Sequence, residues 1–123
     1  MTLLLDTHVL LRWLANDPKL SDGHRALIAD SSHAVFVSSV SIAEIAIKAS
    51  LGKLGAPEQV REAVLASGLS LLPFGAVHAE ELRGLPWIHR DPFDRMLIAQ
   101  ARVEELVLLT VDERIRKYDV SVR

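Results

Sequence analysis

Four acidic residues stand where their carboxyl groups could act together on a substrate. Asp6 directly follows the apolar run "LLL", and Asp112 comes at the end of "VLLTVD". Glu44 lies early in an apolar helical pattern, and Asp94 lies near the start of another, "DPFDRMLIAQA". If the apolar runs are parallel strands, all four positions fall at or near the carboxyl edge of the sheet, where α/β proteins bind their ligands.

The chemistry of four converging acids follows from their mutual repulsion. One pair of like charges about 5 Å apart costs roughly 3 kcal/mol at an effective dielectric near 20, and four acids make six such pairs. Protons or cations must therefore neutralise some of them. Carboxylate oxygens suit Mg²⁺ or Mn²⁺, which in pairs can activate a water molecule and stabilise the leaving oxygen of a phosphodiester. The pattern predicts phosphodiester hydrolysis.

Each acid also has a structural interpretation when taken alone. Asp6 could cap the helix that follows it, and Asp112 could be a turn residue. Glu44 lies three residues after Ser41, the spacing of a capping box, and four before Lys48, the spacing of a helical ion pair. Its helix is apolar nearly all round, so a carboxylate there needs a partner or a metal. Both interpretations of Glu44 stay open.

The segment "HRDPFDRMLIAQA" has the features of a well-formed helix start. Asp91 is expected as the N-cap and Pro92 as the first helical residue, with Asp91 and Arg95 at an ion-pair spacing. Asp94 then lies on the first turn and faces whatever lies beyond the helix N-terminus. Asp94 is therefore the better candidate for chemistry.

The elements that must position these acids are short apolar runs alternating with helical patterns. Strands are expected at 3–5, 34–39, 69–74 and 107–112, with a fifth near 120–122. Helices are expected at 7–15, 22–30, 41–52, 57–67 and 77–82, with a long one from 92 onward. Wholly apolar strands alternating with helices are typical of a covered parallel sheet with right-handed crossovers. The sequence predicts one α/β domain over residues 1–123, a three-layer α/β/α sandwich with a mostly parallel central sheet.

Composition limits the function classes. A chain of 123 residues, half of them hydrophobic and 24% charged, is expected to fold as one globular domain. The net charge of −2 gives no overall positive field, so a polyanionic substrate would need local positive charge. The chain has no cysteine, which excludes thiolate metal sites and disulfides. It shows neither a basic leader nor an apolar run of membrane-spanning length, so a soluble cytoplasmic protein is expected.

Four segments in order, "LLLDTHVLLRWL", "VSSVSIAEIAIKASLGKL", "HRDPFDRMLIAQA" and "LLTVD", resemble the PIN-domain family and, within it, the VapC-type toxin ribonucleases of bacterial toxin–antitoxin pairs. The resemblance implies a carboxylate pocket that binds Mg²⁺ or Mn²⁺ and cleaves single-stranded RNA by an activated water. It places the catalytic and metal-binding acids at Asp6, Glu44, Asp94 and Asp112. It also implies a homodimer and a small antitoxin protein that blocks the pocket.

Several neighbouring residues have open roles. Thr110 matches a hydroxyl position that often accompanies the fourth acid, and His8 stands where many family members have Asn. Four large apolar residues are expected mainly in the core, with a partner surface as the alternative: Trp13, Leu51, Leu54 and Trp87. Four cations could hold RNA phosphates or be ordinary solvated charges: Lys48, Lys53, Arg90 and Arg95.

Two other readings have the same fold class. A receiver-like phosphoacceptor domain would need an acid at the end of the third strand, where this chain has "LSLLPF". A catalytically inactive protein-binding module would keep the fold and act only through its partner. The presence of all four acids disfavours the second reading.

Overall fold

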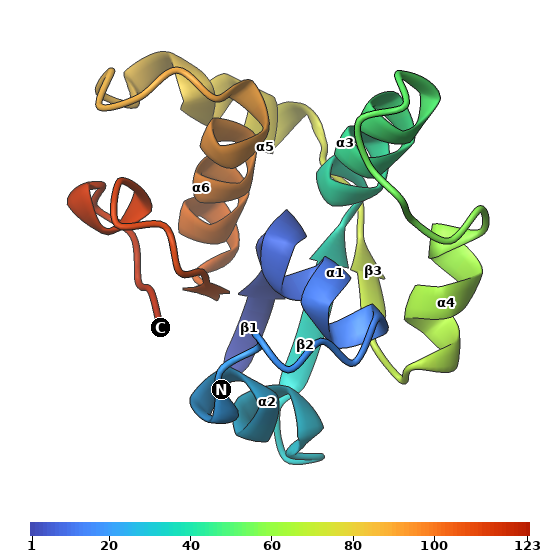
Figure 1. Ribbon diagram of the computed structural model, residues 1–123. Helices are drawn as coiled ribbons and strands as arrows, with labels where there is room; N and C mark the ends of the chain where they lie inside the picture. The colour runs from blue at the N-terminus through green and yellow to red at the C-terminus, as the bar shows by residue number, and fades with distance from the viewer.

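Four parallel strands form one sheet in a computed structural model that describes all of residues 1–123 (Figure 1). The strands are β1 (Thr2–Leu5), β2 (Ala34–Ser38), β3 (Ser70–Leu72) and β4 (Val107–Leu109), in the order β3-β2-β1-β4. The central strand β1 pairs Leu4 with Phe36 on one side and with Leu108 on the other. Because all pairs are parallel, the carboxyl ends of the strands meet at one edge of the sheet.

Helices connect and cover the strands. They are α1 (Thr7–Leu14), α2 (Asp22–Ala29), α3 (Ser39–Ser50), α4 (Val60–Ala66), α5 (Ala76–Glu81) and α6 (Pro92–Glu104), with the 3₁₀ turns η1 (Leu82–Gly84) and η2 (Ile115–Lys117). In Figure 1 the strand tips point toward the space between α3 and α6. No helix has the length and apolar character needed to cross a membrane.

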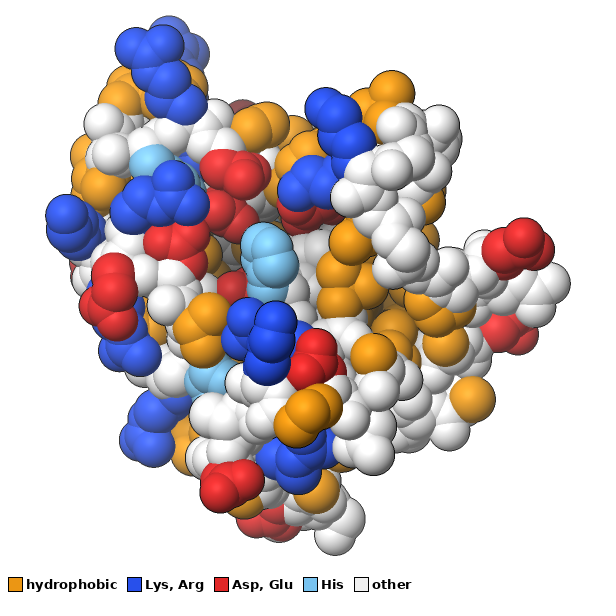
Figure 2. Space-filling view, in the orientation of Figure 1, with side chains coloured by type: hydrophobic (Ala, Val, Ile, Leu, Met, Phe, Trp, Pro, Cys, Tyr) orange, Lys and Arg blue, Asp and Glu red, His pale blue; other side chains and the backbone are white.

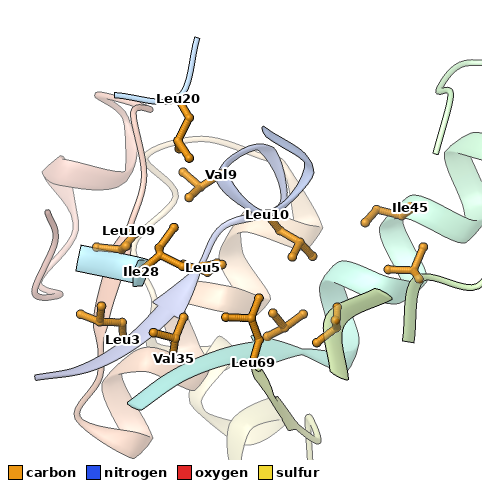
Figure 3. Close-up of a cluster of buried hydrophobic side chains, with 13 residues drawn as sticks. Leu3, Leu5, Val9, Leu10, Leu20, Ile28, Val35, Ile45, Leu69 and Leu109 are labelled. Carbon is orange, nitrogen blue, oxygen red and sulfur yellow. The ribbon is translucent and has the colours of Figure 1, made fainter. Parts of the chain in front are cut away.

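Two apolar cores lie on opposite faces of the sheet because side chains alternate along each strand. Leu3 and Leu5 point into the first core, where they meet residues of α1, α2 and α4 (Figure 3). Leu4 points into the second core, which α6 fills from the other side. Helix α3 contributes to both cores, because Ile45 packs in the first core and Val40 packs in the second. The predicted three-layer α/β/α fold is confirmed.

Two local predictions were wrong, and a third is confirmed only in part. Pro57 is not the first residue of a helix, because α4 begins at Val60 after Gln59. Ser41 does not cap α3, because the helix starts directly after β2 and Ser38 is its N-cap. The expected fifth strand is reduced to a single parallel bridge between Val122 and Leu108, which extends the sheet beyond β4.

Candidate active site

Asp6 ends β1 and caps α1. Its Oδ1 accepts a hydrogen bond of 2.7 Å from the backbone N–H of Val9, so the predicted cap is confirmed. The side chain is buried at the carboxyl edge of the sheet, beside the buried Thr110 at the end of β4. Burial raises the pKa of Asp6, and hydrogen bonds from Thr110 and Val9 partly oppose that rise. Asp6 is thus a cap and also a partly desolvated carboxylate at the predicted site.

Glu44 lies in the second turn of α3 and is only 3% exposed. Its Oε2 accepts a hydrogen bond from Lys48, as the helical spacing predicted. Its Oε1 is buried and has no hydrogen-bond partner. The capping box does not form, because the Ser41 hydroxyl accepts a hydrogen bond of 3.0 Å from Thr7 and so links α3 to α1. A buried carboxylate oxygen without a partner is rare and is the kind of group that a cation satisfies.

Asp94 lies in the first turn of α6. Asp91 is the N-cap, with Oδ1 accepting from the backbone N–H groups of Phe93 and Asp94 at 2.9 and 3.1 Å, and Pro92 is the first helical residue. This prediction is confirmed. Burial raises the pKa of Asp94, and the negative charges of Asp91 and Asp112 raise it further, whereas a hydrogen bond from His89 lowers it.

A buried group holds Asp94 in place, and the sequence did not predict it. His89 Nε2 lies 3.1 Å from Asp94 Oδ2, and His89 Nδ1 lies 2.8 Å from the Tyr118 hydroxyl. That hydroxyl oxygen already accepts from Arg95 at 3.1 Å and from the backbone N–H of His89 at 3.2 Å. Its own proton has two nearby acceptors, His89 Nδ1 at 2.8 Å and the His89 carbonyl oxygen at 3.4 Å, and the shorter distance assigns the proton to Nδ1. The neutral ring then carries its own proton on Nε2, which donates to Asp94. No spacing rule connects residues 89, 95 and 118, because a loop and the tertiary fold bring them together.

Arg95 has a different partner from the one its spacing predicts. Instead of pairing with Asp91 it is buried, and it donates to the carbonyl oxygens of Pro86 and Leu85 at 2.7 and 3.3 Å. Its guanidinium also lies 3.8 Å from the centre of the Trp87 ring. The predicted Asp91–Arg95 ion pair was wrong, and Arg95 is not free to hold a phosphate.

Asp112 forms a local turn at the end of β4. Its carboxylate accepts from the backbone N–H of Arg114 at 2.9 Å and from the guanidinium of Arg114 at 2.7 Å. The hydrogen bond from the Arg114 side chain is the main cause that lowers the pKa of Asp112. Thr110 Oγ1 accepts from the backbone N–H of Asp112 at 3.0 Å, so Thr110 contacts Asp112 as well as Asp6.

The four candidate acids lie at one edge, but they are not all in contact. The charge of Asp112 acts on Asp94, and Lys48 on α3 is close enough to Asp94 and Asp91 for both charges to raise its pKa, after the larger effect of its hydrogen bond to Glu44. No three Asp, Glu or His side chains are close enough together to hold a metal ion in this arrangement. Figure 2 shows acidic side chains and a histidine gathered where this face is hollowed, with Lys and Arg on both sides.

The PIN domain profile matches residues 3–121. The chain belongs to the PIN-domain family. PIN domains are nucleases. No curated protein matches the chain's sequence at a significant level.

Solved structures with the same fold come from several bacteria. VapBC2 from Rickettsia felis, bound to a promoter DNA fragment, is 16% identical with a TM-score of 0.74, and the match covers 100% of this chain and 98% of that chain. DNA-bound VapBC from Salmonella typhimurium is 20% identical with a TM-score of 0.73, covering 100% and 97%. VapBC-1 from nontypeable Haemophilus influenzae is 19% identical with a TM-score of 0.68, covering 100% and 97%. The likeness extends over the whole PIN domain.

The donor set of this PIN domain fits a hard divalent cation in its chemistry. Asp6, Glu44, Asp94 and Asp112 offer only carboxylate oxygens, and Glu44 Oε1 is buried without a partner. Three of these carboxylates now accept hydrogen bonds from side chains of the protein, which are Lys48, His89 and Arg114. A cation bound here would replace part of the charge neutralisation that these side chains provide.

Proposed function

We propose that this PIN domain is a metal-dependent endoribonuclease that cleaves single-stranded RNA in the cytoplasm and acts as the toxin of a toxin–antitoxin pair. The observation that carries the proposal is the buried, unpartnered Oε1 of Glu44, at the sheet edge that also bears Asp6, Asp94 and Asp112. These four residues would hold Mg²⁺ or Mn²⁺. When bound, the metal would supply an activated water and charge stabilisation at the cleaved phosphodiester.

The chain's own groups prepare this site. The N–H of Val9 and the hydroxyl of Thr110 orient Asp6, and the Nε2–H of His89 orients Asp94. Hydrogen bonds of this kind fix ligand side chains and save ordering cost when a metal binds. Lys48 and Arg114 carry positive charge next to the acids and could pair with an RNA phosphate once a metal releases them.

The toxin role and the partner rest on the structural relatives. The similar structures named above are VapBC assemblies, and another is described as a toxin–antitoxin complex from Klebsiella pneumoniae. We infer a cognate antitoxin and a homodimer for this chain. Ile47 on α3 and Leu51, the residue that caps the C-terminus of α3, are 48% and 62% exposed and provide apolar surface for such contacts. Leu51 thus departs from the expected core placement, whereas Trp13 and Leu54 pack against the first core as expected.

The rival readings are less well supported. A receiver-like domain would need a phosphoacceptor acid after β3, but Leu72 is followed by Pro73 and Phe74. An inactive binding module would have no use for a buried carboxylate oxygen without a partner, which costs free energy in the folded state.

An RNA cleavage assay tests the proposed activity. Purified protein should cleave a single-stranded RNA with Mn²⁺ and not with EDTA. Asp94→Asn should abolish cleavage while the fold persists, and Asp91→Asn is the matched control because Asn caps a helix about as well as Asp. Full activity of Asp94→Asn would remove that residue from the mechanism. For the toxin role, expression should arrest growth, and co-expression of a small neighbouring reading frame should relieve the arrest.

A further inference from the structure

Trp87 is an exposed indole next to the candidate active site. It lies in the loop between η1 and α6, and 77% of it is exposed, although the sequence led us to expect a core residue. One face of the ring is covered by the Arg95 guanidinium, 3.8 Å from its centre. The large exposed fraction leaves the rest of the ring open to solvent. Exposed aromatic surface of this kind marks an interaction site more often than an isolated exposed aliphatic residue does.

The cation that covers Trp87 has little freedom to move. Arg95 is 4% exposed and donates to the carbonyl oxygens of Leu85 and Pro86 and to the Tyr118 hydroxyl. These contacts fix the guanidinium, and the cation–π contact in turn orients the indole. The binding of a planar group to the open face of Trp87 would therefore carry only a small entropic cost for ordering protein side chains.

The hollow beside Trp87 carries only positive charge. Its charged lining residues are Arg83, Arg90 and Arg95, and no carboxylate lines it. Arg83 and Arg90 are exposed and form no ion pair or side-chain hydrogen bond in this structure. The rest of the lining is Leu82, Trp87, Pro92 and Met96. Local positive charge around an aromatic ring is the combination that binds single-stranded nucleic acid.

We propose that Trp87, Arg83 and Arg90 form a subsite for single-stranded RNA, in which a base stacks on the open face of Trp87 and the flanking phosphates pair with the two arginines. The inference rests on the proposed function and deepens it. The subsite adjoins the candidate active site, because the same loop continues into Asp91, and Arg95 contacts the Tyr118 hydroxyl that fixes His89 against Asp94. The surface supplies the local positive charge that a chain of net charge −2 needs for a polyanion.

Binding without cleavage tests the subsite separately from the chemistry. Fluorescence anisotropy in EDTA would compare an eight-nucleotide oligouridylate with an abasic ribose-phosphate oligomer of the same length. Trp87→Ala should weaken oligouridylate binding on the order of tenfold and leave the abasic oligomer unaffected, because only the stacking contribution is lost. Trp87→Phe should retain most of the affinity. Val77→Ala, which truncates another exposed apolar residue on the adjacent α5, is the matched control.

The arginines have their own readout. Replacing both, in Arg83→Gln/Arg90→Gln, should weaken both oligomers and lower the slope of log affinity against log salt by about 1.4, which corresponds to two lost phosphate contacts. Trp13→Phe leaves Trp87 as the only indole, and its fluorescence should be quenched by oligouridylate and not by the abasic oligomer.

Three outcomes would overturn the inference. One is equal affinity of Trp87→Ala and the wild type for oligouridylate. Another is dissociation of a dimer by Trp87→Ala with RNA binding unchanged, which would assign the indole to an interface between copies. The third is a Trp87→Ala variant that binds the antitoxin more weakly than the wild type does but binds RNA equally well. The two proposals can be refuted separately. An unchanged KM for RNA cleavage in Trp87→Ala would refute the RNA subsite but not the nuclease activity. Binding of oligouridylate without any cleavage of RNA would refute the nuclease activity but not the subsite.

Discussion

Removing the Lys48 charge should reveal how Glu44 is held and whether a cation can replace the lysine. Lys48 gives Glu44 its only hydrogen bond, through Oε2, while Oε1 has none. In Lys48→Met most of the alkyl stem is kept, and the ammonium group, which lies 6.0 Å from the centre of the Phe93 ring, is lost. The variant therefore leaves a buried carboxylate with neither oxygen paired. The double variant Lys48→Met/Glu44→Gln removes that charge as well.

The size of the effect follows from the burial of the two partners. An unpaired buried charged group costs about 1–3 kcal/mol or more. The Lys48 side chain is 38% exposed and that of Glu44 is 4% exposed, so the ion pair is partly screened by solvent. We expect Lys48→Met to lose about 1–2 kcal/mol of unfolding free energy, which lowers Tm by roughly 4–8 °C for a chain of this size. The double variant should regain part of this loss.

Thermal unfolding with and without Mn²⁺ checks the reasoning. In the wild type a cation at Glu44 Oε1 would lie close to the positive charge of Lys48 on Oε2, whereas in Lys48→Met that repulsion is absent, so Mn²⁺ should raise Tm more in the variant. At a hundredfold excess over Kd the stabilisation would be about 2.7 kcal/mol. Lys53→Met is the control, because Lys53 is exposed and pairs with no acid. Equal Mn²⁺ shifts in Lys48→Met and in the double variant would refute a cation at Glu44.

Three further changes test the other acids. Asp6→Asn should keep the cap, abolish cleavage and raise stability at pH 7 by about 0.5–2 kcal/mol. Asparagine should be the more stable residue because burial raises the pKa of Asp6 above 3.8, so the folded protein loses stability as the pH rises through the raised pKa and the carboxyl group ionises. A lower Tm of the variant at pH 7 would contradict this. Tyr118→Phe should cost about 1–3 kcal/mol in urea unfolding, since it removes one hydrogen-bond partner from the buried Arg95 and one from the buried His89 Nδ1, and an unchanged midpoint would disprove that role. Arg114→Gln should raise the pKa of Asp112 toward its ordinary value in an NMR titration, and an unmoved midpoint would exclude Arg114 as the cause.

The order of elements could be predicted because the apolar runs are too short for helices and are separated by helical patterns. The position of the acids followed from the same pattern, since Asp6 directly ends a run and Asp91 with Pro92 marks a helix start. These signals are local: each depends on a few neighbouring residues. Sequence reasoning was therefore sound where local chemistry decides the structure.

Two kinds of detail were out of reach. The start of α3 offered three serines, Ser38, Ser39 and Ser41, and a capping rule cannot choose among them; the end of β2 decides, because α3 follows it without a loop. Arg95 had a suitable local partner in Asp91, but burial against Tyr118 and the carbonyl groups of 85–86 provides more contacts than an exposed ion pair. Such choices depend on tertiary packing, which cannot be deduced from the spacing of residues in the sequence.

The repulsion expected between bare acids is relieved residue by residue in the folded chain. Glu44 has Lys48, Asp94 has the Nε2–H of His89, and Asp112 has Arg114. Each compensating group comes from the element that bears its acid or from the loop just before it, so each acid can fold without waiting for the others. Because three carboxylates are compensated in this way, the acidic edge can form before any cation binds. A cation would then compete with Lys48 and Arg114, and its affinity would be lower than four free carboxylates would give.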